Sequence, residues 1–425
     1  MKKTIILAAF AALTLGACTK VETIETKAPE AVSFGVYAGK AVDTKAVSGT
    51  DYGTVTTTSL QAPTSNGFGV FGYYTDAADY TSNTKANFMY NQQVTYSGGN
   101  WTYNPVKYWP NEHGASAVST DTDKLTFLAY APFVANKDIA GDKGVSITDK
   151  AGSAAADEGI TAMTANNVAG DAVLTFKVPA SSEEQIDLLY GVLGAQYQNV
   201  ENTTVGTVGS PMENLTKQKT DGKISILFKH ALAKIAIDIK EVVNAASPTT
   251  SVNPGSNGTK VVVKSLKLKG TNIGTQGKLN LYARTWTDVT SSATEFVVQP
   301  LPAAISVAAA PTSYPDINGV DEDGLGTTID LMLIPATSMQ ITGVEIVYYV
   351  CTNDTQLDGG VSVIENKISR NFDSPLSIAM GKQYSLNVLL GLTSVDLTAT
   401  VDNWDTSAGT TNVDLPKNVT TPAEP

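Results

Sequence analysis

Cysteine and histidine are nearly absent from this chain of 425 residues, which contains two of each. Structural zinc sites need several Cys and His ligands at short spacings, and neither His113 nor His230 stands in such a pattern. We therefore expect no metal site and no cofactor, and His230 is interpreted as a core or edge residue rather than a catalytic base. The sequence also lacks a G-x-S-x-G elbow, a Walker loop and a dinucleotide fingerprint. An enzyme is not expected.

Charged residues are also scarce, at 16% of the chain, and acids outnumber bases by 41 to 29. With a formal net charge of −12 the sequence has no basic stripe to neutralise phosphates, which excludes nucleic acid as an expected partner. Few charges combined with abundant Thr, Gly, Val and Ala favour β-sheets over charged amphipathic helices.

The N-terminus has the pattern of a lipoprotein secretion signal. Two lysines precede an apolar run at residues 5–15, and the small residues Gly16 and Ala17 lead to Cys18. The run is shorter than the ~20 apolar residues that cross a bilayer, so it is interpreted as a leader that is removed. We predict a signal peptide at residues 1–17 and lipidation of Cys18. The alternative is an ordinary leader with a chance cysteine at its junction.

Removal of the leader would leave 425 − 17 = 408 residues, enough for two or three domains. Cys351 would then be the one cysteine besides the acylated residue, so an intrachain disulfide is excluded. A lone thiol in an exported chain is expected to be buried and inert, with an intermolecular role as the alternative.

Alternation of apolar and polar residues indicates strands. Residues 395–402 alternate with a period of two, and residues 344–350 and 384–390 do the same. In residues 223–240 the apolar set moves from even to odd positions, which predicts a bulge or short turn at residues 229–233. Because alternation flanks the tract from His230 to Lys234, that tract is interpreted as strand rather than helix.

The composition changes along the chain and suggests its organisation. A tether rich in Thr, Glu, Lys and Pro follows Cys18, and Gly- and Thr-rich sequence at residues 199–222 marks the best domain boundary. The predicted domains are residues 46–215 and residues 216–404. They are preceded by an N-terminal segment at residues 18–45 and followed by a tail at residues 405–425.

Two local patterns each have two interpretations. Residues 316–324 have the oxygen density of a calcium loop, but Gly319 and Val320 break the ligand alternation of an EF-hand, which favours a solvated acidic turn. An aromatic cluster fits either stacking on sugar rings or core packing, and packing is favoured because large aromatics usually serve burial. Its members are Tyr96, Trp101, Tyr103, Tyr108 and Trp109.

Several short motifs follow one another in a fixed order. They are NFMYN at 87–91, WTYNPVKYWP at 101–110, LTFLAYAP at 125–132, DLLY at 187–190, ISILFKHALAKI at 224–235, GKQY at 381–384 and VDNW at 401–404. In this order, behind a lipoprotein leader, the sequence resembles the fimbrillin family of Bacteroidales-type bacteria. The motifs are spread over most of the chain.

The resemblance implies an all-β fold of two tandem transthyretin-like β-sandwich domains with Greek-key-type antiparallel sheets. It also implies a structural subunit of a cell-surface fimbria that contributes to adhesion and colonisation. Such precursors are lipoproteins of the outer membrane, and a trypsin-like protease removes an N-terminal segment that includes the first strand. A strand from a neighbouring subunit then fills the groove, which is β-augmentation.

The resemblance assigns roles to both ends of the chain. Val32, Phe34 and Val36 alternate in the removable segment, and processing is expected between Lys45 and Ala46, where the family often has arginine instead of lysine. The expected partners are other fimbrial subunits (further copies or related fimbrillins), the outer membrane through the lipid anchor, and a host or bacterial surface ligand.

The tail has apolar residues at even spacing. Val413, Leu415 and Val419 form a possible donor strand, while a disordered polar tail is the alternative because Pro416 has no backbone N–H to donate. A tip adhesin that accepts a strand without donating one, and a monomeric glycan-binding surface lipoprotein, are the rival functions. A hydrolase is a more distant one.

Overall fold

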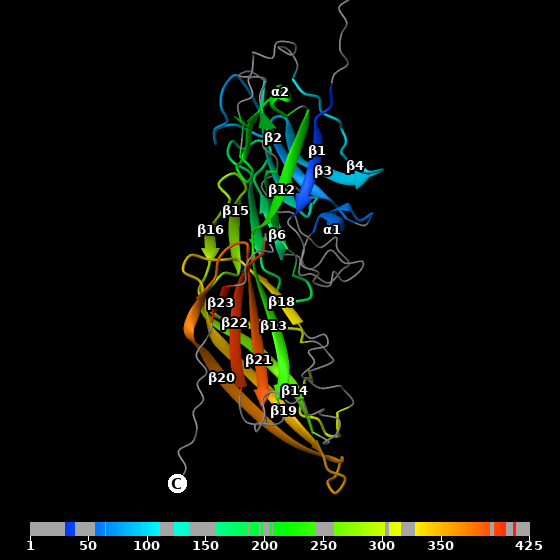
Figure 1. The fold of residues 1–425 in the computed structure, drawn as a ribbon, viewed down its shortest axis with the longest axis vertical. Coiled ribbons are helices and arrows are strands. Elements are labelled where there is room, and N and C mark those ends of the chain that lie inside the picture. Colours follow the sequence, from blue (N-terminus) through cyan, green and yellow to red (C-terminus); the bar gives the residue numbers. More distant parts are fainter. Residues whose placement is uncertain are drawn as a thin grey trace, which may run out of the picture.

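The computed structural model of the protein is built almost wholly of β-strands, which confirms the expected all-β class. Two short helices are present in the described part, α1 (Thr57–Gln61) and α2 (Lys217–Thr220). Figure 1 shows an elongated molecule in which one group of sheets, here called the first block, stands above a second block. The structure describes residues 30–38, 56–63, 65–110, 123–135, 158–185, 187–194, 197–198, 204–205, 207–220, 222–242, 259–301, 306–315, 328–391, 395–404 and 411–413.

The first block is centred on an eight-stranded sheet. Its order is β1 (Ser33–Ala38), β12 (Lys223–His230), β8 (Leu189–Leu193), β5 (Lys124–Ala131), β2 (Phe68–Asp76), β3 (Met89–Ser97) and β4 (Asn100–Thr102), with β11 (Met212–Leu215) pairing with β5. The central strands β5 and β8 are buried on both faces. Doubly buried strands have nearly continuous apolar sequences, which explains the motif LTFLAYA in β5.

The two faces of this sheet belong to different cores. Phe71 packs on one face with Phe176 and Leu279 of a four-stranded sheet, whereas its neighbour Val70 packs on the other face with Phe127. The four-stranded sheet runs β16 (Thr285–Thr290), β15 (Gln276–Asn280), β7 (Val173–Lys177) and β6 (Gly159–Met163). A small pair, β9 (Tyr197–Gln198) and β10 (Thr204–Val205), lies apart from both sheets.

The second block consists of two further sheets. One runs β18 (Thr328–Leu333), β13 (Ala233–Val242), β21 (Lys382–Gly391), β22 (Val395–Asn403) and β23 (Thr411–Val413). The other runs β17 (Ala293–Val298), β14 (Thr259–Ile273), β19 (Gln340–Asn353) and β20 (Val361–Ser377). Alternate residues of both sheets, such as Ile237 and Ile346, share the large core cluster. The strands pair antiparallel in both blocks except for β1 with β12 and β13 with β21, which are parallel.

The chain crosses between the blocks at residues 231–232, where a bend separates β12 from β13. This confirms the turn predicted at residues 229–233 and the absence of a helix there. The Ala231 N–H donates to Leu188 O at 2.8 Å, and Trp286 Nε1 donates to Ala231 O at 2.7 Å. The Gly381 N–H donates to Leu232 O at 3.0 Å. The crossing is therefore held by segments from both blocks.

The predicted domain limit between residues 215 and 216 does not coincide with a change of sheet. β12 follows that limit and still lies in the first block, next to β8. β15 also pairs with β7 of the first block, although it follows β14 of the second block in sequence. As a statement about independent folding units, the division into residues 46–215 and 216–404 stays a prediction.

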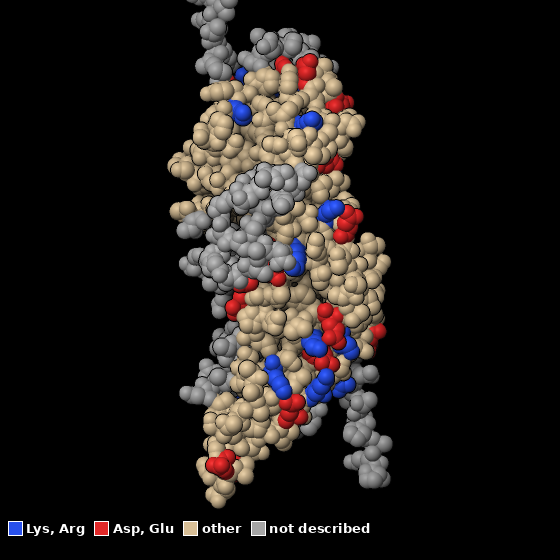
Figure 2. All heavy atoms as spheres, turned by 180° about the vertical axis from the view of Figure 1, so that it is seen from behind, with Lys and Arg blue, Asp and Glu red and all other residues tan. Residues whose placement is uncertain are grey.

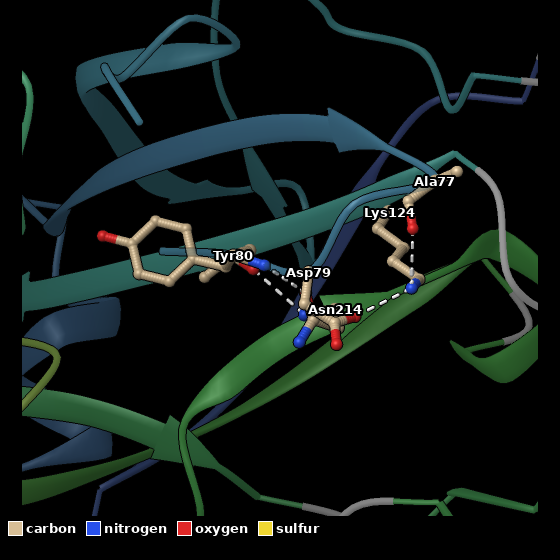
Figure 3. Close-up of polar contacts among 6 residues, drawn as sticks. Ala77, Asp79, Tyr80, Lys124 and Asn214 are labelled. Atoms are coloured by element: carbon tan, nitrogen blue, oxygen red, sulfur yellow. Dashed lines mark hydrogen bonds and ion pairs between the residues drawn. The ribbon is translucent and has the colours of Figure 1, made fainter. Parts of the chain in front are cut away.

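Polar contacts attach the connection between β2 and β3 to the eight-stranded sheet (Figure 3). Lys124 Nζ donates to Ala77 O at 3.0 Å and to Asp79 Oδ1 at 2.8 Å. The Tyr80 N–H donates to Asn214 Oδ1 at 2.8 Å. Asn214 has a φ of 52° at a bulge in β11, a left-handed conformation that asparagine adopts more readily than most residues.

Cys351 is fully buried in a third, small core. It packs with Val262 and Val361, and Val307 and Tyr314 from the segment at residues 306–315 lie against this cluster. Burial raises the pKa of the thiol to about 11, against a smaller lowering effect of the nearby Lys260. This confirms the buried thiol that the sequence predicts.

Charges of both signs are interspersed on the surface. Figure 2 shows basic and acidic side chains side by side on the lower half of one face. In the second block, Lys267 lies 3.1 Å from Glu295 and 3.8 Å from Glu345, which Lys367 approaches to 3.2 Å. Such exposed pairs contribute only about 0–1 kcal/mol each. Among the described residues, no helix is long and apolar enough to cross a membrane.

Candidate functional site at the first strand

The first strand, β1, is the edge strand of the eight-stranded sheet, and together with the residue before it, Val32, it places three apolar side chains in the core. Val32, Phe34 and Val36 are 1%, 4% and 7% exposed. The alternation seen in the sequence is thus the alternation of a strand with one buried face. These three side chains, the preceding Glu30 and the residues that contact them are called the first-strand site.

Phe34 is the centre of this site. Its ring meets Phe68 at 6.0 Å and Phe127 at 6.0 Å, with interplanar angles of 88° and 86°. The ring of Tyr103 lies at 5.7 Å and 61°. Edge-to-face aromatic pairs add about 0.5–1.5 kcal/mol each beyond the area that they bury. Phe34 therefore anchors the first strand through three aromatic contacts.

β1 pairs with β12 along its whole length, in parallel, from Ser33 opposite Lys223 to Ala38 opposite Phe228. Within the described residues, β12 is the one strand that pairs with β1. A short stretch at its N-terminal end is also contacted from the other side, because Ala31 forms an antiparallel bridge with Tyr108.

Backbone and hydroxyl groups from residues 103–109 hold that N-terminal end. The Val32 N–H donates to Lys107 O at 2.9 Å, and the Trp109 N–H donates to Glu30 O at 3.0 Å. Tyr103 Oη donates to Val32 O at 2.8 Å. Burial raises the pKa of the Tyr103 hydroxyl, while its hydrogen bond to the backbone of Lys107 acts in the opposite direction. The hydroxyl therefore stays protonated and remains a donor at neutral pH.

On its other side, the N-terminal end of β1 meets Gly222. The Ser33 N–H donates to Gly222 O at 3.4 Å, and Trp109 Nε1 donates to the same oxygen at 2.9 Å. The Glu30 carboxylate lies 2.9 Å from Lys217 Nζ. Residues 30–33 are thus held by two segments, whereas residues 34–38 are held by β12.

The aromatic cluster lies in this region and is largely packed. Trp109 is 3% exposed, and Trp101 and Tyr103 pack against the core that contains Phe34. Tyr96 meets Trp101 edge-on at 5.2 Å, and Tyr108 is 49% exposed. The packing interpretation of the cluster therefore fits most of its members.

The described part of the tail, β23, lies in the second block. β23 pairs antiparallel with β22, and Val413 lies opposite Ala399. Leu415 and Val419 lie outside the described residues, as do Cys18, Lys45, Ala46, His113 and the acidic residues 316–324. The structure therefore brings Val32, Phe34 and Val36 together in the first block and places Val413 in the second block.

His230 is the last residue of β12 and lies at the crossing between the two blocks, outside the first-strand site. It is 5% exposed, its Nδ1 lies 2.7 Å from Asp187 Oδ2, and its ring stacks on Trp404. This is the satisfied core histidine that the sequence predicts. Among the described residues no group of three or more His, Cys, Asp and Glu is placed to hold a metal ion.

Sequence reasoning did not single out Lys217, Gly222 or the roles of Tyr103 and Trp109 in holding β1. Tyr103 and Trp109 lie in the motif WTYNPVKYWP, which carried the family resemblance but gave no sign of the segment it contacts. Lys217 lies almost two hundred residues from Glu30, and no local pattern in the sequence links them.

Comparisons with known proteins agree with this fold. The fimbrium subunit Fim1C of Phocaeicola vulgatus is 27% identical over 269 residues, which cover 62% of this chain and 55% of that protein. The chain thus aligns with little more than half the length of that relative. A crystal structure of a fimbrial protein from Bacteroides vulgatus has a TM-score of 0.59 at 21% identity, covering 88% of this chain and 99% of that one. At 21% sequence identity, this structural similarity shows that the two proteins share a fold.

A family model described as fimbrillin-like matches residues 44–404, most of the chain. This protein belongs to the fimbrillin-like family.

Proposed function

We propose that this protein is a structural subunit of a cell-surface fimbria that is assembled by protease-triggered strand exchange and contributes to adhesion. The family membership supports the fimbrial role. The observation that carries the mechanism is that an N-terminal edge strand fills the core through three alternating side chains, Val32, Phe34 and Val36, that are 7% exposed or less.

The energetics of the first-strand site fit a strand that is replaced rather than lost. Full burial of a Val or Phe side chain contributes about 1.5–3 kcal/mol. An empty site would therefore expose apolar surface and lose several kcal/mol of stabilisation. It would also leave the edge of β12 unpaired, which is a template for another strand. Removal of β1 would therefore leave a subunit with high affinity for an extended apolar segment.

The segment between β1 and α1 is where a cut must fall. β1 ends at Ala38, and Leu60 of α1 is the next described residue of the first-block core. Cleavage between Lys45 and Ala46 lies between these two residues in the sequence, so it would separate β1 from the rest of the described core. Lys45 is a suitable residue for a trypsin-like protease.

The tail supplies a candidate donor. Residues 405–425 can extend about 70 Å, enough to reach a neighbouring subunit. Because β23 is paired at the edge of the second block, donation requires the short β22–β23 pairing to open first. Pairing over three residues is a weak contact compared with the buried first strand.

The lipoprotein leader places the precursor at the outer membrane with Cys18 as its anchor. Other fimbrial subunits are then the partners. The packed state of Trp101 and Trp109 does not favour a glycan-binding monomer, since rings that stack on sugars must be accessible. Among the candidate functions, we therefore favour a polymerising subunit over a tip adhesin, and either of these over a glycan-binding monomer. No catalytic role is proposed.

The decisive experiment compares purified chain cut after Lys45 with the same cut chain lacking residues 405–425. The intact cut chain is expected to elongate, alone or with related subunits, and the tail-deleted form is expected to remain a folded monomer. Equal polymerisation of both forms would show that the tail is not the donor strand. If neither form elongates but both cap existing filaments, the tip role is the correct one.

A further inference from the structure

The entry end of the first-strand site contains a position that is filled by a carboxylate. The Glu30 side chain lies between Lys217, whose Nζ is 2.9 Å from Glu30 Oε2, and Gly222. Lys217 is only 13% exposed although it carries a charge, while Glu30 is 43% exposed. We call this position the carboxylate niche, and we number the places that Glu30 to Val36 occupy, at the start of β1 and just before it, as slots 30 to 36.

Gly222 makes room for the carboxylate. It has a φ of +74°, a left-handed conformation that favours glycine. A Cβ at this position would meet the Glu30 carboxylate, so its absence leaves the space that the acid occupies. The carboxylate niche thus combines close packing against Gly222 on one side with an ion pair to Lys217 on the other.

Most other contacts at this end are indifferent to the side chain of the bound strand. Slots 30 and 32 are held through backbone groups by Trp109, Lys107 and Tyr103, which any residue other than proline at slot 32 satisfies. The site therefore discriminates between bound strands by the charge of the side chain at slot 30 and by the burial of apolar side chains at slots 32, 34 and 36. The strand that fits has an acid followed by apolar residues two, four and six positions later.

The tail of this chain lacks that pattern. Its acids are Asp405, Asp414 and Glu424, and none is followed or preceded by apolar residues at distances of two, four and six. An unmatched slot 30 would leave the Lys217 ammonium, largely withdrawn from water, without the carboxylate that faces it.

Lys417 restricts the tail further. With Val413 in slot 32, Lys417 falls in slot 36, and with Leu415 in slot 32 it falls in slot 34. Both slots are apolar in the structure, and a buried unpaired lysine is costly. Placing Thr411 in slot 32 avoids this, but Gly409 then takes slot 30 and the carboxylate niche stays empty.

We infer that the first-strand site selects a strand with an acid two residues before its first apolar anchor, and that this strand comes from a different fimbrial chain rather than from a second copy of this one. The inference rests on the proposed strand exchange and narrows its partner. The tail of this chain correspondingly enters a subunit of another type.

The test uses the full chain with a specific protease sequence placed within residues 46–55, cut so that β1 stays bound until it is displaced. The probes are fluorescent peptides: residues 28–40, the same peptide with Glu30→Gln or Glu30→Lys, and the tail peptide of residues 407–419. Displacement is measured on the unchanged site and on Lys217→Gln and Lys217→Glu variants. Lys278→Gln is the matched control, because Lys278 forms an exposed pair with Asp288 in a different sheet.

On the unchanged site and the Lys278→Gln control, the Glu30 peptide is expected to bind about 2- to 5-fold more tightly than the Gln peptide, the range for a partly exposed ion pair. This preference should vanish in Lys217→Gln and turn toward the Lys peptide in Lys217→Glu. The tail peptide should bind most weakly.

Equal binding of the Glu and Gln peptides to the unchanged site would overturn the carboxylate selection. A tail peptide that binds as well as residues 28–40 would overturn the choice of a different chain. If no peptide exchanges, including the unaltered one, the strand-exchange function itself fails and the inference falls with it. The first two results leave strand exchange standing.

Discussion

The imidazole of His230 lies flat on the indole of Trp404, with ring centroids 3.8 Å apart and planes 1° from parallel. His230 ends β12 in the first block, and Trp404 follows β22 in the second. Asp187 orients the imidazole from the strand-edge segment before β8, with 2.7 Å between Oδ2 and Nδ1. The stack therefore connects the two blocks at the point where the chain crosses between them.

Trp404→Ala is expected to destabilise the protein by about 3–5 kcal/mol, the usual cost of truncating a buried aromatic. The loss should affect both blocks, because the indole is 8% exposed and its partner lies in the other block. Urea unfolding followed by circular dichroism measures it. Tyr108→Ala is the control, since Tyr108 is 49% exposed and should change stability by about 0.5 kcal/mol or less. Similar losses in both variants would argue against the connecting role of the stack.

Phe34→Ala in the uncut precursor is expected to cost about 3–5 kcal/mol, since its ring contacts Phe68, Phe127 and Tyr103. The variant should also be cut faster near β1 by a nonspecific protease, because the strand separates more often. Val106→Ala, an exposed change near the same strand, is the comparison. A precursor that tolerates Phe34→Ala as well as Val106→Ala would show that β1 is not anchored by this ring.

Cys18→Ala is expected to abolish incorporation of labelled fatty acid and to prevent normal surface display, because the thioether forms on this sulfur. Metabolic labelling followed by cell fractionation measures both. Cys351→Ala serves as the matched cysteine variant, since Cys351 is buried in the folded protein, and it should leave labelling unchanged. Undiminished acylation of Cys18→Ala would refute the predicted anchor.

Lys45→Ala is expected to block maturation, so that protein recovered from the cell surface begins at Cys18 instead of Ala46. A trypsin-like protease needs the basic side chain before the cut bond. N-terminal sequencing gives the result directly, and Lys40→Ala provides a control lysine in the same segment. Protein that still begins at Ala46 in the Lys45→Ala variant would exclude Lys45 as the recognised residue.

The Cys351 thiol predicts an alkaline loss of stability. Burial raises its pKa in the folded chain to about 11, from an ordinary value of 9.0. The folded state therefore binds the proton more tightly, and this contribution to stability is present below pH 9 and is lost as the pH rises through about 11. The difference in unfolding free energy between pH 8 and pH 10.5 should be larger in the parent than in Cys351→Ala, both made with Cys18→Ala.

Buried tyrosines contribute to the same alkaline loss of stability, because burial raises the pKa values of Tyr73, Tyr80 and Tyr130 in the folded chain. The comparison with Cys351→Ala isolates the thiol from them. In the folded parent, a thiol reagent at pH 8 should react slowly and then rapidly after unfolding. Fast labelling of the folded chain would contradict the buried position of Cys351.

Much of the local structure could be predicted from the sequence. The alternation at residues 384–390 and 395–402 corresponds to β21 and β22, and the change of phase near His230 corresponds to the bend at residues 231–232. Alternation also identified Val32, Phe34 and Val36 as one face of a strand. These features depend on side-chain period, which is a local property of the backbone.

The sequence by itself determined the all-β class, the strand faces and the leader pattern with Cys18, because each follows from neighbouring residues. Only the tertiary structure decided which strands are neighbours: β1 beside β12, β15 beside β7, and the Asp187, His230 and Trp404 contacts between the blocks. It also decided that Lys217 and Gly222 receive Glu30. A period of two says which side of a strand is buried, whereas its partner is chosen by packing between segments far apart in the chain, which no local pattern records.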